Sequence, residues 1–80
     1  NFPNPFNPTT TISFSLPKAG FISLSVYNIL GEEVAKLINE DLSAGNHRIT
    51  FDASQLTSGI YVYSLKSQGK ALSKKMVLVK

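Results

Sequence analysis

The sequence lacks cysteine and tryptophan, and it contains a single histidine, His47, within 80 residues. Without cysteine the chain forms no disulfide, no thiolate metal site and no cysteine nucleophile. One histidine is too few for a histidine-rich zinc site. Because charged residues make up only 16% of the chain and hydrophobic residues 42%, disorder is excluded as well. The sequence therefore predicts one small globular domain with few reactive groups.

Long apolar runs are also missing, since no segment approaches the roughly 20 residues of a membrane-spanning helix. We therefore expect no membrane insertion. The chain opens on Asn-Phe-Pro-Asn-Pro instead of the basic and apolar regions of a signal peptide, which suggests a junction with a preceding polypeptide. The basic residues are few and are not interleaved with stacking aromatic rings, so nucleic acid is not an expected partner.

Charge is unevenly distributed along the chain. No acid follows Asp52, whereas five of the eight basic residues lie in the last fifteen positions. This asymmetry indicates either an anionic partner at the C-terminal end or lysines that keep a terminal edge strand from pairing with other chains.

The first eight residues hold three of the four prolines, which rules out a helix there. Phe2 and Phe6 would each gain about 1.5–3 kcal/mol if buried, and Pro5 between them stiffens the segment. We therefore predict that residues 1–8 form a docked lead-in and that residues 9–80 form the rest of a single domain.

Apolar and polar residues alternate with a period of two through most of the remaining chain, which is typical of half-buried strands. Six strands are expected, near residues 11–16, 22–27, 33–39, 47–51, 60–65 and 71–80. The segment Glu33–Asn39 also fits a short helix, because Val34, Leu37 and Ile38 follow helical spacing; its length favours a strand. Regular turn signals between short strands predict an all-β fold, an Ig-like antiparallel β-sandwich of six to seven strands.

The turns between these strands contain residues suited to them. Gly31 and Gly45 can adopt a positive φ, and Asp52 can cap the turn that follows its strand through its carboxylate. We expect these three residues to be structural.

Catalytic patterns are weak. Serines, His47 and Asp52 supply the residue types of a hydrolytic triad, but a G-x-S-x-G turn is absent. The other four acids flank one predicted strand in adjacent pairs, as solvated turn charges do, and no calcium-binding loop pattern is present. The sequence therefore predicts no catalytic residue, no metal ligand and no cofactor, and hence no enzyme. Tyr61 and Tyr63 share one face of a strand, which fits either a sugar-stacking platform or ordinary packing.

The terminal run Lys74–Lys80 is apolar on both faces between flanking lysines. Such a strand is either buried on both sides or available to pair with another strand. An exposed edge of this kind also leaves open pairing between two copies of the domain.

Several segments, taken in order, resemble a known family. The matching segments are NFPNPFNPTTTI (1–12), VYNILGEEV (26–34), LSAG (42–45), FD (51–52), LTSGIY (56–61) and KMVLVK (75–80). In this combination the chain resembles the C-terminal sorting domain of the type IX (Por) secretion system, which is related to the FlgD-type Ig-like domain. The resemblance covers essentially the whole chain, with Phe2 in place of a frequent tyrosine.

The resemblance implies a sorting label fused to the C-terminus of an N-terminal cargo protein. Such a label directs export through the outer membrane to the cell surface or medium, and its implied partners are an outer-membrane translocon and a sortase-like peptidase that cuts upstream of Asn1. The positions that match the family's recognition region are Gly59, Tyr61, Lys74, Lys75, Val77, Val79 and Lys80. The rival interpretation is a non-catalytic Ig-like spacer or carbohydrate-binding module of an extracellular enzyme.

Overall fold

The computed structural model describes residues 9–79, which form six β-strands. Their bounds are β1 (Thr9–Leu16), β2 (Gly20–Tyr27), β3 (Glu33–Leu42), β4 (Gly45–Asp52), β5 (Gly59–Ser67) and β6 (Lys70–Leu78). Within this part of the chain there is no helix of the length and apolarity needed to cross a membrane. The expected all-β fold is confirmed. The predicted lead-in, residues 1–8 with Phe2, Pro5 and Phe6, lies outside the described residues, as does Lys80.

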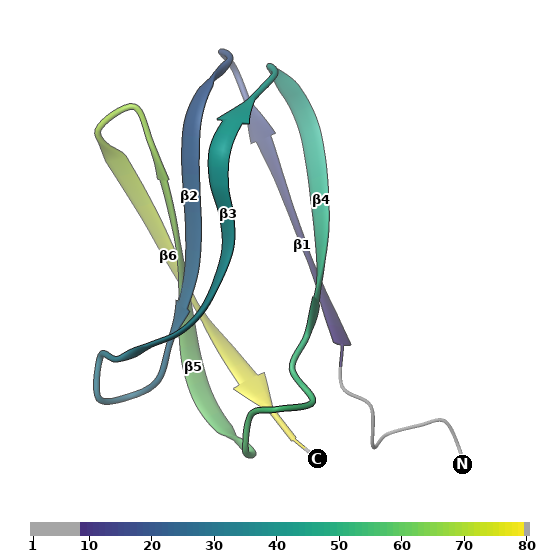
Figure 1. Ribbon diagram of the computed structural model, residues 1–80, viewed down its shortest axis with the longest axis vertical. Helices are drawn as coiled ribbons and strands as arrows, with labels where there is room; N and C mark the ends of the chain where they lie inside the picture. Colours follow the sequence, from purple (N-terminus) through teal and green to yellow (C-terminus); the bar gives the residue numbers. More distant parts are fainter. Residues whose placement is uncertain (1–8, 80) are drawn as a thin grey trace.

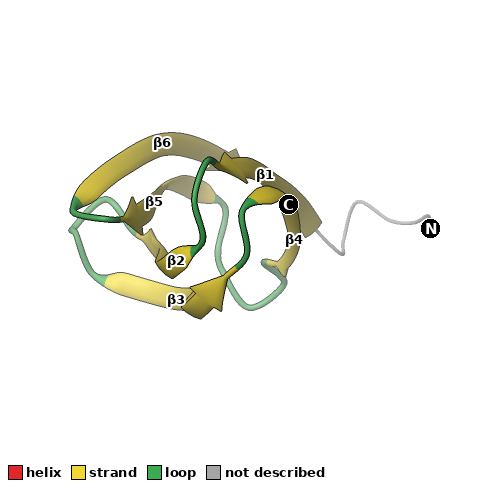
Figure 2. Ribbon diagram, turned by 90° about the horizontal axis from the view of Figure 1, so that it is seen from above, coloured by secondary structure: helices red, strands yellow, loops and turns green. Residues whose placement is uncertain are grey.

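The strands form two antiparallel sheets. One has the order β3-β2-β5-β6 and the other consists of β1 and β4. The connections β1–β2, β3–β4 and β4–β5 each pass from one sheet to the other, as in Greek-key sandwiches of the Ig type. Seen end-on, the four-stranded sheet curls, and the β1–β4 pair lies across its concave side (Figure 2).

The core lies between the two sheets and is centred on β2. The alternating residues Ile22, Leu24 and Val26 are completely buried, so each contributes roughly 1.5–3 kcal/mol of hydrophobic stabilisation. Ile12 and Leu16 of β1 cover one half of β2, and Phe51 of β4 belongs to the cluster that covers the other half. The period-two pattern of these strands therefore identifies their buried faces correctly.

The ambiguous segment after Gly31 is a strand with two irregularities. Leu24 pairs with Ile38 and Ser25 pairs with Lys36, so Leu37 is an extra residue in the ladder; a second register shift skips Val34. Each shift breaks the period of two. Apolar residues therefore fall at helix-like spacing although the segment is extended.

The turn residues singled out from the sequence lie at or between the ends of strands. Gly31 and Gly45 have φ angles of 83° and 121°, which side-chain-bearing residues rarely adopt. The backbone N–H of Ser54 donates to Oδ1 of Asp52 at 2.9 Å, so the aspartate caps the turn after β4. In the β2–β3 turn, Oδ1 of Asn28 accepts the backbone N–H groups of Leu30 and Glu32.

Candidate recognition surface

Strand β6 is the edge of the four-stranded sheet. It pairs with β5 along its whole length, and within residues 9–79 no strand pairs with its other side. Its last residues reach the end of the molecule that also holds the β2–β3 and β4–β5 turns (Figure 1). A free edge offers backbone donors and acceptors to an additional strand.

The predicted recognition residues of β6 lie on both faces of this edge. Met76 and Leu78 point into the core, while Val77 and Val79 are 62% and 75% exposed. Lys74 is opposite Tyr63 and Lys75 is opposite Val62, so the two lysines point to opposite sides of the sheet. The sequence left open whether the apolar run 76–79 is buried or available for pairing. In the structure, alternate residues of this run face the core and the others face solvent.

Gly59 and Tyr61 are placed differently from the exposed members of the predicted set. Tyr61 is only 6% exposed and belongs to the core cluster that includes Leu78. Its hydroxyl donates to the backbone carbonyl of Thr57 at 2.7 Å. Gly59 pairs with Leu78, and a Cβ at Gly59 would meet only the Tyr61 ring, at 3.9 Å. These two residues fix the end of β6 against β5.

Three further apolar residues, which the sequence reasoning did not single out, extend the exposed surface. Ile60 is the cross-strand neighbour of Val77 on the outer face. Ile60 and Ile29 line one shallow hollow of about 390 Å³, and Leu30 beside Ile29 is 78% exposed. The available signal was two large aliphatic residues inside a turn bounded by Asn28 and Gly31, where polar residues are usual.

We call the residues Ile29, Leu30, Ile60, Val77 and Val79 the apolar end patch. They are five of the seven large hydrophobic residues that are exposed in the described part of the chain. Scattered exposed aliphatic residues are normal in soluble proteins, whereas their concentration at one end of a small domain makes that end a candidate interaction surface.

Among residues 9–79, Lys74 and Lys75 near the patch form no salt bridge with an acidic side chain. Within residues 9–79 the salt bridge found joins Lys36 to Glu33, 3.5 Å apart on β3. Lys74 and Lys75 on β6 are exposed. The β6 edge therefore combines an apolar end with uncompensated positive charge.

Other chemistry considered from the sequence has a structural explanation. The His47 ring stacks on Phe14 with centroids 5.5 Å apart, and its Nε2 lies 2.7 Å from the carbonyl oxygen of Ser43, to which it donates. No group of three histidine, aspartate or glutamate residues in the described segment is arranged to hold a metal. Tyr61 is buried, and Tyr63 packs against both core clusters, so these rings form packing contacts in place of an open platform.

Comparison with protein families decides between the remaining interpretations. The family model described as the secretion system C-terminal sorting domain matches residues 1–80, the whole chain. The chain belongs to this family. No curated protein and no solved structure is similar enough to the chain to add to that assignment.

The domain is thus a C-terminal sorting signal for type IX secretion. Such a signal implies an N-terminal cargo, an interaction with the type IX machinery, and export across the outer membrane to the cell surface or medium. The spacer or carbohydrate-binding module considered from the sequence is not favoured. Sorting signals of this family are not catalytic.

Proposed function

We propose that the type IX machinery recognises this sorting domain at the end of β6, through the apolar end patch together with Lys74 and Lys75. The observation that supports this most strongly is an unpaired strand edge that ends in exposed aliphatic side chains, Val77 and Val79. Lys80 follows directly in the sequence and belongs to the proposed set. Gly59 and Tyr61 contribute by holding β6 in place.

The proposed mode of recognition is strand addition. A strand of the partner would pair with the free backbone groups of β6, which supplies affinity that is independent of sequence. Val77 and Ile60 would then fill apolar pockets of the partner, and Lys75 on the same outer face would meet carboxylates. The side chains supply specificity, because backbone pairing alone does not discriminate between strands.

The partner in this proposal is the outer-membrane translocon, and a sortase-like peptidase acts afterwards on the junction with the cargo. The domain contributes a folded shape and a readable edge and performs no chemical step itself. Pairing of two domains through β6 is the competing use of the same edge, and it would hide the patch from the translocon.

Export of a reporter tests the proposal. Residues 1–80 are fused to the C-terminus of a periplasmic reporter in a bacterium with a type IX system, with Val77→Asp as the test variant. Val77 is exposed, so a carboxylate there should not unfold the domain, but it should block an apolar contact. Thr50→Asp places the same charge at an exposed position of β4 and serves as the matched control.

We expect the wild type and Thr50→Asp to be exported and Val77→Asp to accumulate in the periplasm as folded protein. Equal export of all three would contradict the proposed surface while leaving the family assignment intact. Wild-type domain that elutes as a dimer before export, with Val77→Asp monomeric, would instead assign the patch to self-association.

A further inference from the structure

The first residues of β6 place a positive charge on the side of the sheet that faces the core. Lys70 is the cross-strand neighbour of Ser67, and Leu72 is that of Leu65, which packs against the core. Lys70 and Leu72 therefore point to the core side of the sheet, yet Lys70 is exposed and Leu72 is 57% exposed. Among residues 9–79 this part of the inner face is open.

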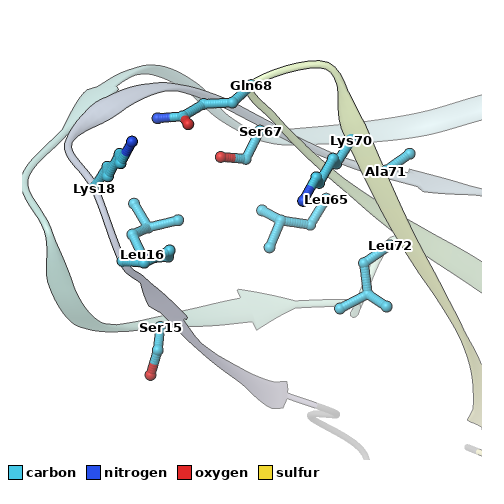
Figure 3. A pocket seen from close by; sticks show the side chains of 10 residues that line it. Ser15, Leu16, Lys18, Leu65, Ser67, Gln68, Lys70, Ala71 and Leu72 are labelled. Carbon is cyan, nitrogen blue, oxygen red and sulfur yellow. The ribbon is translucent and has the colours of Figure 1, made fainter.

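A hollow of about 370 Å³ lies at this place, between the end of β1 and the start of β6. Its floor is apolar and is formed by Leu16, Leu65 and Leu72. Lys18 and Lys70 lie on opposite sides of it (Figure 3). The hollow therefore combines an aliphatic surface with two ammonium groups.

The upper rim of the hollow is formed by Ser67 and Gln68 (Figure 3). The backbone of Gln68 has a φ of 51°, which residues with a side chain rarely adopt. Its side-chain amide donates to the carbonyl oxygen of Ala19 at 3.3 Å and so ties the β5–β6 turn to the β1–β2 turn. Gly20 leaves room for this contact, because a Cβ there would lie 3.0 Å from Nε2 of Gln68. The rim is thus formed before any ligand binds, which lowers the cost of binding.

The charges around the hollow are all of one sign. Among residues 9–79 no acidic side chain lines it, and neither Lys18 nor Lys70 takes part in the salt bridge found in that part of the chain. A shared anion would form charge-assisted hydrogen bonds with both lysines. An uncharged apolar occupant would instead bring the two ammonium groups out of water without a partner, which is unfavourable.

We propose that this hollow binds an anionic amphiphile, a single-chain carboxylate. Its head group lies between Lys18 and Lys70, and its alkyl chain covers Leu16, Leu65 and Leu72. Small-molecule sites enclose about 300–1,000 Å³, and this hollow is at the lower end of that range. A carboxylate with one chain of medium length fits this volume better than a lipid with two acyl chains.

Such a ligand would join the two sheets of the sandwich. Within the described residues β1 pairs only with β4, and β6 pairs only with β5, so no strand pairing links β1 to β6. Lys18 belongs to the β1–β2 turn and Lys70 to β6, and a head group bound to both would bridge this gap. A ligand that binds only the folded state raises its stability.

The inference is independent of the recognition surface proposed above. The hollow lies by Leu72 and the apolar end patch lies by Val79, at opposite ends of β6. Binding of a carboxylate at one end therefore neither requires nor excludes contact of the secretion machinery at the other.

Calorimetric titration of the full 80-residue chain with octanoate, below its micelle concentration, tests the proposal. Acetate supplies the head group without the chain, and octanol supplies the chain without the charge. We expect saturable binding of octanoate and about tenfold or more weaker binding of acetate and of octanol. Octanoate at about a hundred times its Kd should also raise the thermal midpoint.

Variants of the hollow test the two parts of the site separately. Lys70→Met keeps an unbranched side chain and removes the ammonium group, so it should weaken octanoate binding about tenfold. Lys66→Met is the matched control, because Lys66 is exposed and, as the neighbour of Ser23, lies on the outer face of the same sheet. Leu72→Asp places a carboxylate in the floor and should abolish binding. Because Leu72 is exposed, this change should leave the domain folded.

Four results would overturn the proposal. Octanol that binds as tightly as octanoate would indicate a purely apolar contact. Acetate that binds as tightly would indicate a free anion held by surface lysines. Equal octanoate affinity of Lys70→Met and the wild type, or backbone amide NMR shifts at residues 77–79 in place of residues 67–72, would put the ligand elsewhere. Absence of saturable octanoate binding would contradict the site itself.

Discussion

Replacing Tyr61 by phenylalanine separates the structural part of the family motif from the part that a partner contacts. The Tyr61 ring is buried with Leu78, and its hydroxyl donates to the Thr57 carbonyl at 2.7 Å. Phenylalanine keeps the ring and removes the hydroxyl, which leaves that carbonyl without the donor and also removes a longer contact of 3.4 Å with Oγ1 of Thr57. The net loss is about 1 kcal/mol, and in a domain of this size it lowers the thermal midpoint by roughly 4–8 °C.

Urea denaturation at 25 °C and thermal melting followed by circular dichroism measure this loss. Tyr27→Phe is the matched control, because no hydrogen bond of its hydroxyl is found among the described residues; we expect a shift below about 0.5 kcal/mol. If Tyr61→Phe were as stable as the wild type, the reasoning on the Thr57 contact would be wrong. If it kept its stability and lost export, the hydroxyl itself would be read by the machinery.

The remaining predictions concern the turns that set the register of the strands. Gly45→Ala should destabilise the domain by about 1–3 kcal/mol, because the φ angle of Gly45 is 121°. Gly59→Ala should change stability little in the same urea titration, because the added Cβ would meet only the Tyr61 ring, at 3.9 Å. Asn28→Ala removes the acceptor of two backbone N–H groups and should cost about 1–2 kcal/mol. Asn28→Asp keeps the acceptor but places a carboxylate where the Asn28 amide donates to Oε1 of Glu32 at 2.8 Å, so it should recover only part of that loss. An Asn28→Ala variant as stable as the wild type would contradict the capping role.

Local features of the sequence were sufficient to predict most of the strands and turns. Period-two alternation located β1 and β2, and the residue types at Gly31 and Asp52 indicated how their turns close. These features could be predicted because each depends on neighbours within a few residues. The segment Glu33–Asn39 was ambiguous because bulges at Val34 and Leu37 depend on pairing with β2, which local sequence does not determine.

The recognition surface was predictable only in part. The lysine-flanked apolar run of β6 identified the strand, but its position at the sheet edge depends on the strand order. The spacing of Tyr61 and Tyr63 indicates that the two rings share one face of a strand, but it does not indicate whether that face is buried. Burial also depends on how the strands are arranged. Ile29 and Ile60 are 31 positions apart, and only the fold places them around one hollow.

Lys74 and Lys75 of β6 are compatible both with recognition by a partner and with protection against aggregation. Charged residues on an edge strand hinder pairing with identical copies, because like charges would meet. The same charges allow pairing with an acidic partner strand. Protection against aggregation and selection of a partner are therefore compatible roles of Lys74 and Lys75.

Site-specific photo-crosslinking tests most directly whether the machinery contacts the end of β6. A photoreactive amino acid replaces Val79, which is 75% exposed, in the reporter fusion within a type IX host, and the same amino acid at Thr50 provides the control. We expect position 79, and not position 50, to form an adduct with an outer-membrane component of the secretion system. Adducts at position 50 alone, or equal adducts at both positions, would contradict recognition at this end of the domain.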